Sequence, residues 1–148
     1  MAADLTPPRR FVLSQDGHTL DGPAPAVHPL PAAGATLVDL WSSDVVPLDN
    51  ATVGDPTMQG DFMLMPAGAL FRWVVIQPTG DAEPMWHQTD STDFSWILTG
   101  EVTLMWRGGQ TVLRVGDACV VRGGEHAWAS HTDQPMSLVT VGVAAVAI

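Results

Sequence analysis

Short apolar stretches, most of them separated by glycine or proline, run through most of this chain and leave no segment with convincing helical periodicity. Most are four to eight residues long, and turn residues return about every eight to twelve positions. That spacing is typical of an antiparallel β-sandwich or barrel. We expect strands at Arg10–Leu13, Leu37–Trp41, Phe62–Met65, Phe71–Ile76, Phe94–Leu98, Val102–Trp106, Thr111–Val115, Ala118–Val121 and Ser137–Val146.

Glycine and proline also predict how these strands are joined. The run from Arg107 to Gln110 predicts a hairpin turn, because its paired glycines can supply positive φ. Six prolines fall within residues 7–31, where they fix φ and remove backbone donors. We therefore predict an extended N-terminal arm laid over a sheet. The length fits a single domain, residues 1–148, with the arm and early strands in 1–57 and the barrel core in 58–148.

The charge of the chain argues against polyanionic partners. The formal net charge is −10, and the six cationic residues are all arginines. Without a basic patch to neutralise phosphates, nucleic acid and anionic membrane are poor partners. No window approaches the roughly 20 apolar residues of a membrane span. The expectation is a soluble, cytoplasmic protein that binds a small molecule.

The composition also narrows the available chemistry. Lysine and tyrosine are absent, which removes Schiff-base chemistry and phenolic acids. The one thiol, Cys119, lies in an apolar stretch and is expected to be a small buried residue rather than a nucleophile. Any chemistry must come from histidine, carboxylate or hydroxyl side chains, or from a bound ion.

Two motifs bring histidines and a carboxylate together. The first runs from His87 to Phe94 and the second from Gly116 to Trp128. Alternation along a strand places His87 and Thr89 on one face of the first segment, and His126 and Trp128 on one face of the second. Both imidazoles can therefore face the inside of a barrel.

These two motifs resemble those of small single-domain cupins. The first has the form His-x-Thr-Asp-x-x-Asp-aromatic, and the second Gly-Asp-x-x-x-x-Arg-Gly-x-x-His-Ala-Trp. The resemblance implies a jelly-roll β-sandwich or barrel and covers most of the chain, most strongly from Gly80 onward. Cupins usually hold a divalent metal with three histidines and a glutamate, and His87, Asp93 and His126 match three of these positions. Thr89 stands in place of the second histidine.

The resemblance thus implies a site of two histidines and one carboxylate at His87, Asp93 and His126, which would also be the catalytic residues. Such a set can hold Fe, Mn, Ni or Zn, and the sequence does not choose among them. The alternative is that histidine and aspartate form only a hydrogen-bonded pair. Even then, a carboxylate beside an imidazole in an apolar barrel is a general acid–base pair.

Other residues are expected to contact the substrate or a second subunit. Trp86, Thr89 and Trp128 neighbour the proposed ligands, and Arg122 either meets the substrate at the barrel mouth or pairs with Asp117 or Glu101. Phe94 and Trp96 have the opposite parity to Asp93 and are expected between the sheets of a homodimer. His18, His28 and His131 lie in loop-like surroundings and are expected to be exposed.

Three functions fit these residues. The first is a metal-dependent cupin enzyme of the lyase, decarboxylase or isomerase kind, acting next to a carbonyl of a largely apolar, oxygenated substrate. The second is an Fe(II)-dependent dioxygenase, which the two-histidine, one-carboxylate set allows. The third is a cupin that binds a small molecule without turnover, because one expected histidine is missing. A shared fold does not decide among them.

Overall fold

Antiparallel strands make up almost all of the regular structure in the computed structural model, which describes residues 6–17, 19–24, 26–51, 55, 57 and 67–146. The strands are β1 (Arg9–Leu13), β2 (Thr19–Pro23), β3 (Ala26–Leu30), β4 (Ala35–Ser43), β5 (Ala69–Ile76), β6 (Ser91–Thr99), β7 (Glu101–Trp106), β8 (Gly109–Arg114), β9 (Ala118–Arg122), β10 (His126–Ala129) and β11 (Met136–Ala144). A 3-10 turn, η1 (Pro31–Ala33), joins β3 to β4, and the described residues contain no α-helix. The expected all-β jelly-roll fold is confirmed.

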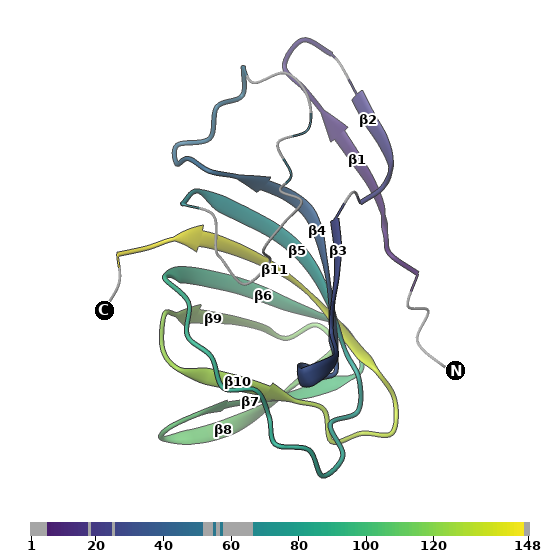
Figure 1. The fold of residues 1–148 in the computed structure, drawn as a ribbon, viewed down its shortest axis with the longest axis vertical. Coiled ribbons are helices and arrows are strands. Elements are labelled where there is room, and N and C mark those ends of the chain that lie inside the picture. Colours follow the sequence, from purple (N-terminus) through teal and green to yellow (C-terminus); the bar gives the residue numbers. More distant parts are fainter. Residues whose placement is uncertain are drawn as a thin grey trace.

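The strands form one large curved sheet and two smaller ones (Figure 1). The large sheet has the order β3-β4-β5-β11-β6-β9, and β10-β7-β8 form a second sheet below it. A separate hairpin of β1 and β2 stands at the top of the molecule. The expected strand at Phe62–Met65 lies outside the described residues, and the other expected strands are present within a few residues of their predicted bounds.

The N-terminal region differs from the expected arm. Arg9–Leu13 is a strand as predicted, but it pairs with β2, and β3 joins the large sheet beside β4. The prediction of an extended arm is therefore wrong for Ala26–Leu30. Proline disfavours central strands because it lacks a donor, but β3 is an edge strand and tolerates Pro29.

The turn between β7 and β8 is a two-residue hairpin, as the glycine pair predicts. Trp106 lies directly opposite Gly109, so Arg107 and Gly108 form the connection. Neither glycine of the pair has positive φ, which corrects the predicted reason for their presence. A Cβ on Gly108 or Gly109 would lie 3.2 or 3.3 Å from the indole of Trp106, so these glycines make room for that ring.

Apolar residues fill the space between the large and small sheets at one end of the barrel. Ile97, Val102, Met136 and Leu138 form this core with Ile76, and all are buried. The opposite face of the large sheet carries a second buried cluster around Val38, Trp73 and Val75. Of these two clusters, the first lies between the sheets and holds them together, and its residues Ile76 and Leu138 also border the cavity described below.

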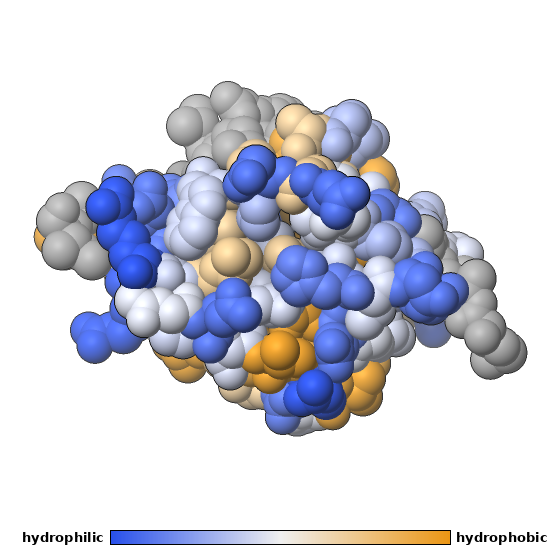
Figure 2. All heavy atoms as spheres, turned by 90° about the horizontal axis from the view of Figure 1, so that it is seen from below, coloured by the Kyte–Doolittle hydropathy of each residue, from blue (hydrophilic) through white to orange (hydrophobic). Residues whose placement is uncertain are grey.

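The outer faces of the two main sheets have different chemistry. Figure 2 views the molecule from below, from the side of β7 and β8, and shows mainly hydrophilic residues with a smaller apolar island. The large sheet exposes Phe94, Trp96 and Val120, which are about half accessible to solvent. The described residues form no helix that is long and apolar enough to span a membrane.

Candidate functional site

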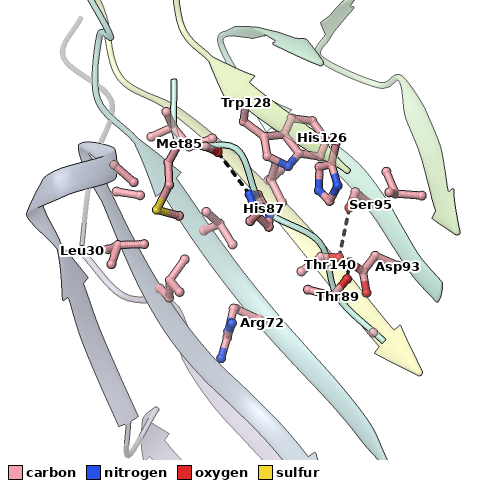
Figure 3. Close-up of a pocket in the computed structure, with 18 of the residues that line it drawn as sticks. Leu30, Arg72, Met85, His87, Thr89, Asp93, Ser95, His126, Trp128 and Thr140 are labelled. Carbon is pink, nitrogen blue, oxygen red and sulfur yellow. Dashed lines mark hydrogen bonds between the residues drawn. The ribbon is translucent and has the colours of Figure 1, made fainter. Parts of the chain in front are cut away.

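A cavity of about 170 Å³ lies between the two main sheets (Figure 3). Alternate residues of the strands point into it, as a pleated sheet requires. Most of its wall is apolar, with Leu30, Ala33, Ala35, Leu37, Leu70, Val74, Ile76, Met85, Val121, Trp128, Leu138 and Gly142. The polar lining is Arg72, His87, Thr89, Asp93, Ser95, His126 and Thr140. The cavity suits a small, largely apolar molecule with a few polar atoms.

His87 and His126 are brought together by the backbone itself. The two residues form an isolated antiparallel bridge, in which each N–H donates to the other's carbonyl at 2.9 Å. The ring centroids lie 4.3 Å apart and the rings are tilted by 54°. The indole of Trp128 meets the His126 ring edge-on at 6.1 Å. The predicted facing of both imidazoles into one interior is therefore present in the structure.

Hydrogen bonds to backbone carbonyls fix the tautomer of both rings. Nδ1 of His126 lies 2.8 Å from the carbonyl oxygen of Gly124, and Nδ1 of His87 lies 3.2 Å from that of Met85. A carbonyl oxygen only accepts, so each Nδ1 must donate its hydrogen. In the neutral ring the lone pair is then on Nε2. Both side chains line the cavity with a nitrogen that can accept a proton or bind a metal.

Burial keeps His126 neutral. Desolvation is the largest influence and lowers the pKa of this imidazole below its ordinary value, and the nearby His87 lowers it further. The hydrogen bond to Gly124 and the charge of Asp93 act in the opposite direction. Because the net effect lowers the pKa, His126 is an unprotonated base at neutral pH.

Two hydroxyl groups hold Asp93 on the cavity wall. The hydroxyl of Ser91, which is buried, lies 2.7 Å from Oδ1 of Asp93 and 2.9 Å from the hydroxyl of Thr89. Thr89 is a weaker donor to the other carboxylate oxygen, at 3.5 Å. The threonine that replaces the expected histidine thus contributes to positioning the carboxylate.

The donor set fits a metal only in part. Two neutral imidazoles with their Nε2 lone pairs available are good ligands for a first-row divalent ion. However, the described part of the chain contains no group of three histidine, cysteine, aspartate or glutamate side chains close enough together to hold one. As placed, Asp93 is bonded to hydroxyl groups instead.

The other expected site residues are divided between the cavity and the surface. Thr89 and Trp128 line the cavity, whereas Trp86 and Arg122 do not. Trp86 has the parity opposite to His87, is exposed and borders a shallow hollow beside Trp106 and Arg107. Arg122 is exposed at another hollow near the C-terminal end of β11. The structure gives both expected partners other contacts: Glu101 pairs with Arg114, and Asp117 accepts from the backbone N–H of Arg114.

Sequence reasoning missed a second polar group, which reaches the cavity wall through Arg72. His28 was expected in an exposed loop, and that expectation is wrong: it lies in β3, and its Nε2 is 3.2 Å from the buried carboxylate of Asp39. Asp39 also accepts from Nε of Arg72, which lines the cavity. The signal available in the sequence was the charge of Arg72 inside an otherwise apolar strand. His131 is exposed as expected, and His18 lies outside the described residues.

The family comparison agrees with the fold and the motifs. Residues 72–142 match the model of the family described as Cupin domain, Cupin_2. This match begins within β5 and includes both histidines and Asp93. The chain therefore contains a small cupin-type domain.

Known relatives and structures extend this result. Phomopsin biosynthesis cluster protein D of Diaporthe leptostromiformis is 31% identical over 101 residues, covering 62% of this chain and 52% of that protein. Phomopsin biosynthesis cluster protein C' of the same organism is 29% identical over 148 residues, covering 87% and 75%. The crystal structure of an ethanolamine utilization protein Q from Salmonella typhimurium has a TM-score of 0.60 at 12% identity, covering 94% of this chain and 96% of that one. Two of the curated relatives are matched over only 36% and 52% of their lengths.

Proposed function

We propose that this protein is a small-molecule enzyme that transfers a proton next to a carbonyl group of a largely apolar substrate. One observation carries the proposal: the backbone fixes the tautomer of two adjacent imidazoles that line an apolar cavity together with a carboxylate. A preorganised base beside a carboxylate in a desolvated cavity suits general acid–base catalysis. Proton transfer of this kind underlies isomerases and many lyases.

His126 is the proposed base. Its Nε2 removes a proton from the carbon next to the substrate carbonyl, and the electron pair of the broken C–H bond moves to the carbonyl oxygen to give an enolate. The positive charge that forms on His126 is stabilised by Asp93, whose charge raises the pKa of this ring. In a saturated ketone or keto acid the proton returns to the same carbon, which is observed as hydrogen exchange. Where a double bond is conjugated with the enolate, the same Nε2 returns the proton at the far end of the extended enolate, which completes an isomerisation without an oxidant.

A divalent ion remains part of the proposal. His87 and His126 would hold it through Nε2, and Asp93 would be the third ligand if it exchanged its bond to Ser91 for the ion. When bound, such an ion would polarise the substrate oxygen. The steps above require only protein groups, because the described side chains do not form a three-residue metal site.

The relatives indicate where such chemistry could operate. Two of them are named as proteins of the phomopsin biosynthesis cluster. We propose that this chain likewise acts on an intermediate of a biosynthetic route. A soluble, cytoplasmic location fits that role.

We also propose that the protein works as a homodimer. Phe71, Val141, Phe94 and Val120 lie opposite one another across four neighbouring strands, which gives a continuous apolar row on the outer face of the large sheet. These four side chains and Trp96 are all exposed, and an apolar patch of this kind often marks an interface. Light scattering of the Trp96→Gln variant should show monomers where the unaltered protein forms dimers, and monomers in both would contradict the dimer.

Deuterium exchange tests the proposed reaction without knowledge of the natural substrate. A panel of branched aliphatic ketones and keto acids is incubated with the protein in heavy water, and exchange at the carbon next to the carbonyl is followed by NMR. The protein should accelerate exchange of at least one compound. The His126→Gln variant should be slower by about 100-fold or more, since general base catalysis typically contributes that much. The matched control is His131→Gln, which alters an exposed histidine outside the cavity.

The same assay separates the competing functions. A compound that binds, as shown by calorimetry, but exchanges no faster than in buffer contradicts the proposal and supports a binding protein without turnover. Failure of the whole panel to bind or exchange also counts against it. Oxygen consumption that depends on added Fe(II) would instead support a dioxygenase. Exchange that disappears with EDTA and returns with one particular ion would establish the metal-dependent form.

A further inference from the structure

We infer that Asp93 and Thr140 form a subsite for a hydroxyl group, which makes the substrate a neutral, branched α-hydroxy ketone. The inference rests on the proposed function, because it names the substrate class of the same cavity. A hydroxyl group both donates and accepts a hydrogen bond. The two side chains line the cavity and offer one partner for each of these roles.

Asp93 can accept a further hydrogen bond. A carboxylate offers about four acceptor positions. The hydroxyl of Ser91 takes one of them on Oδ1 at 2.7 Å. Among the described residues, Oδ2 makes only the long contact with Thr89, at 3.5 Å. Gly142 lies directly opposite Asp93 on β11 and has no side chain to cover it. The carboxylate therefore lines the cavity with an acceptor position open to a ligand.

Thr140 supplies the donor. It lies on β11 opposite Ser95, which is the next residue of β6 after Asp93 to line the cavity. The hydroxyl of Ser95 donates to the Thr140 oxygen at 3.0 Å, so the hydrogen of Thr140 is directed elsewhere. Within the described part of the chain no group accepts that hydrogen, and Figure 3 shows Thr140 beside Asp93. A ligand oxygen between the two side chains would satisfy this donor.

The charges around the cavity favour a neutral ligand. Asp93 repels an anion at this part of the wall. Arg72 does not offset that repulsion, because its charge is already compensated by an ion pair with Asp39, whose side chain is 4% exposed. A hydroxyl group bonds to Asp93 without adding a charge, and a further charge would be costly beside so much apolar surface. The aliphatic side chains of Val74 and Leu138 accommodate the branched part of the ligand.

Such a substrate gives the proposed proton transfer a defined product. His126 takes the proton from the carbon that carries the hydroxyl group, and the electron pair of the C–H bond moves to the adjoining carbonyl oxygen to give an enediolate. Asp93 accepts the hydroxyl proton and passes it to that oxygen. Protonated His126 then returns its proton to the former carbonyl carbon. The carbonyl and hydroxyl groups have exchanged places, and no oxidant is consumed.

Calorimetric titration with a matched pair of ligands tests the subsite. Isobutyroin is a branched α-hydroxy ketone, and the second ligand is the ketone of the same carbon skeleton without the hydroxyl group. The unaltered protein should bind isobutyroin more tightly. Thr140→Val keeps the shape of the side chain but removes the donor, and Asp93→Asn removes the charge of the acceptor. Each change should reduce the preference for isobutyroin by about fivefold or more.

The controls separate hydrogen bonding from folding. Thr140→Ser keeps the hydroxyl group and should retain the preference, which a role in packing alone would not predict. Thr111→Val alters an exposed threonine outside the cavity and should leave the preference unchanged. Far-ultraviolet circular dichroism confirms that each variant is folded. Equal binding of the two ligands by the unaltered protein, or an unchanged preference in both Thr140→Val and Asp93→Asn, would overturn the subsite.

The outcomes for subsite and reaction are separable. A preference for isobutyroin that depends on Thr140 and Asp93, without deuterium exchange at the carbon that carries the hydroxyl group, would support the subsite and contradict the proton transfer. Exchange that requires His126 but shows no preference for isobutyroin over the plain ketone would support the reaction and contradict the subsite.

Discussion

Two groups of imidazole and carboxylate side chains lie at or beside the cavity wall, yet they are bonded in opposite ways. His87, His126 and Asp93 line the cavity, whereas the group of His28, Asp39 and Arg72 reaches it only through Arg72. In the first, Asp39 is shared directly by His28 and Arg72, so the carboxylate is bonded to charged or chargeable partners. In the second, Asp93 is bonded to the hydroxyls of Ser91 and Thr89, and both histidines are held by backbone carbonyls.

The comparison shows how one cavity can hold both a fixed and a reactive group. Where ionic partners satisfy each other, as around Asp39, the group stabilises the fold and orients Arg72. Around Asp93, hydroxyl groups and backbone carbonyls position the side chains instead of ionic partners. The atoms that face the cavity therefore remain able to exchange protons. The type of partner, rather than the type of side chain, separates the two roles.

The largest expected difference between the two groups concerns stability. Asp39→Asn leaves the guanidinium of Arg72 buried without its counter-charge, and breaking a buried pair in this way costs about 3–5 kcal/mol. Urea denaturation should show this loss of unfolding free energy. Asp21→Asn, which breaks the exposed pair with Arg9, is the control and should have little effect. A loss of less than about 1 kcal/mol of unfolding free energy in Asp39→Asn would contradict a stabilising role for the Asp39 group.

Asp93→Asn should have the opposite effects: little change in stability and a large loss of exchange activity. The amide oxygen can still accept from Ser91, so the unfolding free energy should change by less than about 1 kcal/mol. The charge that stabilises protonated His126 is lost, so exchange activity should fall by about 100-fold or more. Full activity in a folded Asp93→Asn protein would exclude Asp93 from the mechanism.

The lowered pKa of His126 predicts a pH effect on stability. Below the ordinary value of 6.5, the unfolded imidazole binds a proton that the folded one resists. Stability from this group is therefore present above pH 6.5 and lost as the pH falls through the folded pKa, by at most about 1.4 kcal/mol per pH unit. Denaturation across this range, with EDTA present, should show a shallower slope in His126→Gln. An unchanged slope would contradict the lowered pKa.

Ser91→Ala should produce the smallest effect and refine the account of Asp93. The hydroxyl of this buried serine contacts both Asp93 and Thr89, and its loss should cost about 1 kcal/mol of unfolding free energy. If Ser91 positions the carboxylate, exchange activity should fall while the affinity for the exchanging compound stays constant. Ser91→Thr should restore activity, which a purely structural role would not require.

The sequence predicted the features that depend on local pattern. Turn residues between apolar stretches identified most strands of the barrel, and the parity of His87 and Thr89 correctly placed both on the cavity side. Parity also explains why Trp86 lies outside: adjacent residues on an extended chain point to opposite faces. A position next to a candidate ligand in the sequence, such as that of Trp86, therefore did not predict that the side chain lines the cavity.

Features that depend on sheet order were not predictable in this way. His28 seemed to lie in a proline-rich arm, but β3 occupies an edge of the large sheet, where proline is tolerated. Its contact with Asp39, and that of Asp39 with Arg72, join three strands whose pairing no local pattern specifies. The same holds for Arg122, whose direction depends on where β9 ends relative to the barrel.

The bridge between His87 and His126 has a consequence for how this protein can diversify. Because the main-chain atoms of these residues make the pairing, their side chains can be substituted without breaking the backbone hydrogen bonds of the bridge. Related chains can thus carry different reactive side chains at these two positions while the backbone fold stays the same. Natural variation here should alter the chemistry sooner than the architecture.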